Sequence, residues 1–189
     1  MKPDKPYAVN RAMAPLFQIA LLSIVLIGCS IGPPDTETRP AKYSALITDW
    51  TPSGLVAHFP NPLPATASNI KLSAFPGFLQ GGAWFQVRLN LPAAEVSKAY
   101  DDATRIAKDF YDGGDALTSC NSKTKTNGLP GTSFHTSDDK KQWEFPADYR
   151  IFVFAAHDAG GTPSFQSGTC YGVVISKQRN EVIYYAESW

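Results

Sequence analysis

Residues that could act as nucleophiles are few, and the best candidate stands in Gly168-Thr169-Cys170-Tyr171-Gly172. This stretch reads G-x-C-x-G, a thiol variant of the nucleophile elbow, which exposes its nucleophile where a strand turns sharply into a helix. Here the following residues, VVISKQRNEVIYY, are typical of a β-hairpin, so the required helix is missing. We therefore interpret Cys170 as structural and predict no catalytic set built on it.

The three histidines, His58, His135 and His157, lie far apart in the chain. None stands in an H-x-x-x-H pattern, and no clustered cysteines accompany them, so the sequence predicts no metal site. We expect His157 at the end of a strand and His58 where an extended segment meets the domain. Phosphate-loop and dinucleotide fingerprints are missing too, so we expect no cofactor.

Two pairs of adjacent carboxylates, Asp101-Asp102 and Asp138-Asp139, are the remaining candidates. Neighbours on a helix point about 100° apart, so the first pair cannot face one substrate atom together. The second pair lacks the D-x-D-x-D-G pattern of a calcium loop. We interpret both pairs as solvated charges.

Four tryptophans could form a core, a rim or a platform for a sugar ring: Trp50, Trp84, Trp143 and Trp189. Trp84 stands out because strand alternation places it opposite Phe85, on the polar face. Burial in the core or rim is the default expectation for all four.

The first thirty residues contain the most specific motif. Three basic residues precede a twelve-residue apolar run over positions 16–27. A helix that spans a bilayer needs about twenty apolar residues, so this run has the length of a signal-peptide core. It ends in Leu26-Ile27-Gly28-Cys29, which resembles the lipobox of bacterial lipoprotein precursors.

The resemblance implies processing and lipidation. In that family the cysteine matching Cys29 receives a diacylglycerol, and the leader, here 1–28, is removed. Two or more acyl chains anchor a protein stably without a transmembrane helix. Ser30 after the cysteine favours the periplasmic face of the outer membrane, with the inner membrane as the alternative. Residues 29–41 are then a lipidated flexible stalk, and 42–189 a single domain.

Lipidation of Cys29 would leave an even pair of cysteines, Cys120 and Cys170, in an oxidising compartment. A disulfide between them would close a loop of about fifty residues, worth roughly 4 kcal/mol on the chain-entropy model. Two buried thiols are the alternative.

Hydrophobic periodicity predicts an α+β fold. The expected strands are 70–76, 83–91, 149–156, 170–176 and 181–189, the last two joined by a hairpin turn over Lys177–Asn180. After the second strand, Pro92 opens an amphipathic helix that runs through Phe110 and stops at Gly113-Gly114. The order β-β-α-β-β-β predicts a largely antiparallel sheet packed on one helix, with a long irregular loop.

The expected strand at 149–156 is apolar on both faces, because Ile151 and Val153 alternate with Phe152 and Phe154. One helix covers only one face, so irregular segments (42–66 and 115–146 are available) or a partner must cover the other. Within the aperiodic stretch 113–147, we expect three aromatic residues to plug into the core: Phe134, Trp143 and Phe145. Such a pinned loop is where a binding surface is expected.

Charge and composition reduce the number of function classes that fit this chain. Without residues 1–28, 14 basic and 16 acidic residues remain, a net charge of −2, which is not typical of nucleic-acid binding. HFPNPLP, FPGFLQGG and YGVVIS-KQRN-EVIYYAESW resemble small uncharacterised bacterial lipoproteins, a likeness that implies no functional residue. We predict a non-enzymatic, lipid-anchored module of the cell envelope that binds an envelope protein or a small ligand. A small exported hydrolase using Cys170 or a histidine is the alternative.

Overall fold

The structure, a computed structural model, describes residues 33–78, 82–114, 132–158 and 168–189. Its helices are η1 (Pro40–Lys42), α2 (Tyr43–Asp49), η2 (Ser53–Val56) and α3 (Ala93–Ile106). Its strands are β1 (Ser68–Phe75), β2 (Ala83–Asn90), β3 (Asp109–Asp112), β4 (Arg150–Asp158), β5 (Gly168–Ser176) and β6 (Glu181–Ser188).

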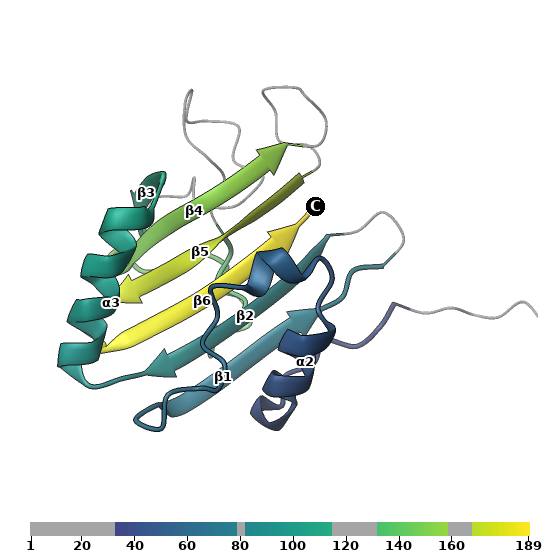
Figure 1. The fold of residues 1–189 in the computed structure, drawn as a ribbon, viewed down its shortest axis with the longest axis horizontal. Coiled ribbons are helices and arrows are strands. Elements are labelled where there is room, and N and C mark those ends of the chain that lie inside the picture. The colour runs from purple at the N-terminus through teal and green to yellow at the C-terminus, as the bar shows by residue number, and fades with distance from the viewer. Residues whose placement is uncertain (1–32, 79–81, 115–131, 159–167) are drawn as a thin grey trace, which may run out of the picture. The chain divides into compact units, whose positions relative to one another are not determined.

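In the described residues, six strands form one sheet in the order β1-β2-β6-β5-β4-β3, and all neighbouring pairs are antiparallel (Figure 1). The predicted α+β class with a largely antiparallel sheet is therefore confirmed. The turn over residues 177–180 joins β5 to β6 as expected. Asn180 closes this turn with a φ of 55°, a left-handed conformation that asparagine tolerates better than most residues.

The expected element order differs from the observed one at two places. Three short helices between positions 40 and 56 precede the sheet, and none of them was predicted. Helix α3 ends at Ile106, and the last turn of the predicted helix is instead β3, in which Phe110 pairs with Phe152. Ala107 is already extended, with a ψ of 137°. Strand pairing with β4 therefore overrides the helical periodicity at this end.

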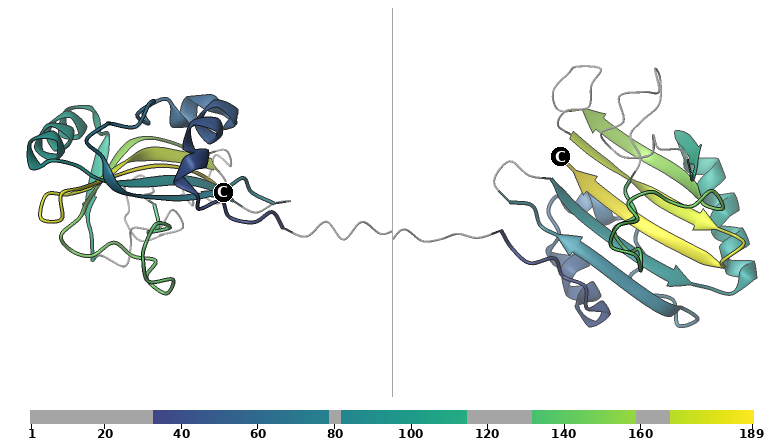
Figure 2. Two further views of the ribbon diagram at one scale, coloured as in Figure 1. Left: turned by 90° about the horizontal axis from the view of Figure 1, so that it is seen from below. Right: turned by 180° about the vertical axis from the view of Figure 1, so that it is seen from behind.

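The first face of the sheet is covered by segment 40–66 and by α3 (Figure 2, left). Alternate residues of β2, Phe85, Val87 and Leu89, are fully buried here. Tyr43, which begins α2, contacts Phe85 edge to face and donates a 2.7 Å hydrogen bond to the carbonyl of Pro60. The short helices are thus held against β2 by a large buried ring.

The opposite face of the sheet is covered by the segment 132–149, which lies across it (Figure 2). Phe134 and Phe145 stack at 4.5 Å and are buried, as predicted, whereas Trp143 is 59% exposed and the prediction for it is wrong. Ile151 and Val153 pack against this segment, while Phe152 points into the other core. Segments of the same chain therefore cover both apolar faces of β4.

The described part of the expected stalk contacts the sheet. Glu37 and Ala74 exchange two backbone hydrogen bonds of 2.8 and 2.9 Å, an isolated bridge on the outer edge of β1. None of the described helices is long and apolar enough to cross a bilayer. The leader 1–28 and Cys29 lie outside the described residues.

Candidate functional site

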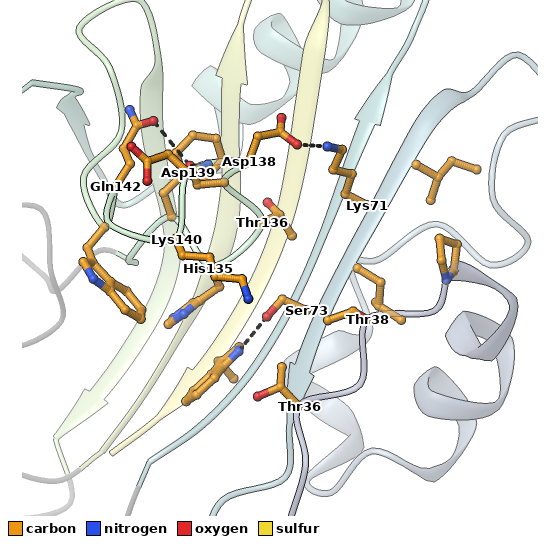
Figure 3. A pocket seen from close by; sticks show the side chains of 17 residues that line it. Thr36, Thr38, Lys71, Ser73, His135, Thr136, Asp138, Asp139, Lys140 and Gln142 are labelled. Atoms are coloured by element: carbon orange, nitrogen blue, oxygen red, sulfur yellow. Dashed lines mark hydrogen bonds and ion pairs between the residues drawn. The ribbon is translucent and has the colours of Figure 1, made fainter.

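A groove of about 550 Å³ lies on the second face of the sheet, between β1, β2, the loop 132–143 and the segment 36–40 (Figure 3). Its walls carry hydroxyl, amide and charged side chains together with aromatic rings. The residues that line it include Thr36, Thr38, Lys71, Ser73, Trp84, His135, Ser137, Asp138, Asp139, Lys140, Gln142 and Trp143. We call this site the β1–loop groove.

Gln86, at the centre of β2, anchors the loop to the sheet. Its amide nitrogen donates a 2.9 Å hydrogen bond to the carbonyl of Ser133, and its amide oxygen accepts two hydrogen bonds from Thr136. Gln86 is fully buried, so both amide atoms have their partners inside the protein. A buried and satisfied amide holds a loop in one position, because every alternative position leaves polar atoms unpaired.

Arg88 supplies a second anchor. It is 4% exposed, donates a 2.7 Å hydrogen bond to Asp138, and lies over the ring of Phe134 at 5.5 Å. Lys71 on β1 contacts the other oxygen of Asp138 (Figure 3). Asp138 is 67% exposed, as expected of a solvated charge, but its carboxylate also ties the loop to two strands.

Four aromatic rings form a continuous row, of which Trp84, His135 and Trp143 line the groove. Phe75 stacks on Trp84 at 4.7 Å, and Trp84 stacks almost parallel on His135 at 4.5 Å. His135 meets Trp143 edge to face at 6.1 Å. The indole nitrogen of Trp84 donates a 3.0 Å hydrogen bond to Ser73, which fixes its rotation (Figure 3). Trp84 thus lies on the loop-covered face, as alternation predicted.

His135 and Glu187 form the pair in the groove that is nearest to an acid–base arrangement. The His135 Nε2 lies 3.2 Å from Glu187, and both side chains are about 90% buried, at 10% and 11% exposure. Glu187 also accepts a hydrogen bond from the hydroxyl of Thr132. Among the described residues, no cluster of three metal-ligating side chains is found. The contact with Glu187 fixes the His135 ring in the wall of the groove.

A second cavity, of about 350 Å³, lies on the first face, between α3 and the sheet. His58 borders it, and its ring is surrounded by Phe59, Phe154, Tyr171 and Tyr184. Its Nε2 donates a 2.9 Å hydrogen bond to the carbonyl of Gly172. Burial lowers the pKa of His58 to about 4, and this hydrogen bond opposes the shift only in part. His58 is thus a packed, neutral side chain, deeper than the boundary position expected.

The other predicted residues do not join the groove. Cys170 is fully buried inside β5, and Cys120 lies outside the described residues, so their disulfide stays a prediction. The cleavage motif Leu26, Ile27, Gly28 and Cys29 also lies outside them. His157 is exposed near the end of β4, as expected. Asp102 is paired with Lys98 and Arg105 on the surface of α3, and these cations hold the pKa of its carboxyl below the usual range.

Reasoning from the sequence missed the two buried anchors. Alternation correctly places Gln86 and Arg88 on the face opposite Phe85, but a polar face was expected to meet solvent. The available signal was the aromatic pair Phe134 and Phe145 in an otherwise polar loop, which indicated that this loop packs on the sheet.

No protein-family model, no curated protein sequence and no solved structure matches this chain.

Proposed function

We propose that this chain is a non-enzymatic binding module of the bacterial cell envelope, tethered by lipid on Cys29, and that the β1–loop groove holds its ligand. The observation that carries the proposal is the exposed indole of Trp143, 59% accessible, at the end of a ring row in a groove that also carries hydroxyl, amide and charged side chains. A concave site lined by rings and a few oriented polar groups is the usual form of a small-molecule site.

Preorganisation supports a binding role. The loop that forms one wall is held by Gln86 and Arg88, both buried, and by the ring of Phe134. A wall that is already ordered loses little conformational entropy when a ligand binds. The groove volume of about 550 Å³ lies within the roughly 300–1,000 Å³ typical of ligand sites.

The tether supports a location close to the membrane. Thr36 lines the groove and follows Cys29 by seven residues. A fully extended chain gains at most about 3.6 Å per residue, so a lipidated Cys29 keeps the groove within about 25 Å of the bilayer surface. The outer membrane is the favoured location and the inner membrane is the alternative.

Site-directed photocrosslinking in native membranes tests the binding role. Benzoylphenylalanine is placed at position 140, an exposed lysine on the groove, and at position 108, an exposed lysine between α3 and β3 that does not line the groove. We expect a discrete adduct at 140 and none at 108, identified by mass spectrometry. The same adducts at both positions, or none at 140, would contradict the proposal.

Metabolic labelling with palmitate tests the tether separately. We expect labelled, membrane-bound protein, and complete loss of the label in Cys29→Ala. Label that persists in this variant would show that the anchor lies elsewhere.

A further inference from the structure

We propose that the ligand of the β1–loop groove is an uncharged carbohydrate, a short glycan presented near the membrane surface. This inference rests on the proposed binding function and names its ligand class.

One large apolar ring is exposed at the groove. Among the described residues, the exposed large apolar side chains are Ile106, Phe110 and Trp143, and only Trp143 borders the groove. An acyl chain would need an apolar surface free of charges, whereas two lysines and two aspartates line this groove. A sugar ring has one apolar C–H face and a polar rim, and its C–H bonds pack on the electron-rich face of an indole.

Several hydroxyl and amide side chains line the groove. Thr36, Thr38, Ser73, Ser137 and Gln142 border the groove with groups that both donate and accept hydrogen bonds. Such groups match the hydroxyls of a sugar, which also act in both directions. The amide oxygen of Gln142 accepts a 3.3 Å hydrogen bond from Ser137 (Figure 3).

The charges in and around the groove balance. Its lining contains two lysines, Lys71 and Lys140, and two aspartates, Asp138 and Asp139. The neighbouring Arg88 and Glu187, which contact this lining, add one charge of each sign. Lys71 and Asp138 are also paired with each other. A site for a phosphate or a polyanion needs unpaired positive charge or several converging arginine or lysine donors. This groove therefore fits a neutral, hydroxyl-rich ligand better than a nucleotide or a phospholipid headgroup.

Glycan binding by the purified, lipidated full chain in detergent micelles tests the inference. The probes are maltotriose, the trimer of N-acetylglucosamine, and a neutral galactolipid mixed into the micelles. Binding is followed by saturation-transfer NMR on the sugar protons of each probe. A free-sugar ligand gives saturable transfer to a trisaccharide, whereas a headgroup ligand gives transfer to the galactolipid alone.

Matched variants locate the binding. Trp143→Ala removes the exposed platform and is expected to weaken glycan binding about tenfold or more, as loss of a central aromatic contact does. Phe110→Ala removes a ring that is 54% exposed outside the groove, and is expected to leave binding unchanged. Equal effects of both variants would overturn the assignment to this groove.

The two proposals fail in different ways. A crosslinked adduct at position 140 that contains a peptide or a phospholipid, with no probe bound, would overturn the carbohydrate inference and keep the binding function. Absence of any adduct and of any glycan binding would overturn both.

Discussion

The side-chain oxygen of Gln86 accepts two hydrogen bonds from Thr136, one from its backbone N–H and one from its hydroxyl, each 2.8 Å long. Both residues are buried and stand fifty positions apart in the chain. The loop that walls the β1–loop groove therefore depends on one amide in the middle of a strand.

Replacement of this amide is expected to destabilise the protein. Gln86→Leu keeps much of the volume but removes the acceptor of both the buried N–H and the hydroxyl of Thr136, which costs about 2–3 kcal/mol in unfolding free energy. Urea unfolding followed by fluorescence measures this loss. Gln142→Leu is the control, since Gln142 is half-buried and makes one 3.3 Å contact, and we expect a change below about 0.5 kcal/mol. Equal effects of both variants would contradict the anchoring role of Gln86.

Asp138 and Asp139 are adjacent but are expected to respond differently to the same substitution. Asp138→Asn removes the charge that faces buried Arg88, whereas Asp139 has no such partner among the described ion pairs. Because Asp138 is itself 67% exposed, solvent screens the pair, and we expect a loss of about 1–2 kcal/mol. Asp139→Asn is expected to change stability by less than about 0.5 kcal/mol. Thermal unfolding of both variants at low and high salt measures the difference, and a larger loss in Asp139→Asn would refute it.

Gly172 lies where β5 passes closest to β4. A Cβ atom at this position would stand 2.0 Å from the carbonyl oxygen of Phe152, a backbone atom that cannot move without breaking strand pairing. We expect Gly172→Ala to lower the unfolding free energy by about 1–3 kcal/mol or to prevent folding. Gly54→Ala, in η2, meets nothing within 4 Å and is expected to be neutral or slightly stabilising. Circular dichroism melts of the two variants compare them, and matching melting temperatures would mean that β4 and β5 are further apart than described.

Burial of His58 predicts a loss of stability in mild acid. Its Nε2 donates to Gly172, so a second proton must enter at Nδ1, which is buried without a hydrogen-bond partner among the described residues. The unfolded chain takes up this proton near pH 6.5, while the folded pKa is lowered to about 4. Stability is therefore fully present above about pH 6.5 and is lost as the pH falls toward 4, by up to about 3 kcal/mol.

Urea unfolding at about pH 7 and about pH 5 measures this dependence. His58→Gln cannot take up the proton, so we expect a smaller difference between the two pH values than in the natural protein. His157→Gln removes an exposed histidine and is expected to keep the natural difference. If His58→Gln retains the full dependence, another group is responsible for it.

Local periodicity in the sequence determined much of the sheet. The alternation over 83–90 assigns Phe85 to one face and Trp84 to the other, because a strand has a period of two. The two-sided apolar pattern at 151–154 correctly requires cover on both faces. The α+β class follows from these patterns together with the hairpin turn at 177–180.

The groove was decided only by the tertiary structure. The loop 132–143 has no period, and its anchors lie about fifty residues away, in a strand whose polar face looks exposed when it is considered alone. Strand β3 shows the same limit. In the sequence, Phe110 continues the helical spacing of the residues before it, but in the structure it pairs with Phe152 of β4. Local pattern reports which face a residue is on, whereas contacts across fifty positions determine what covers that face, and therefore whether Gln86 meets water or holds a binding site in place.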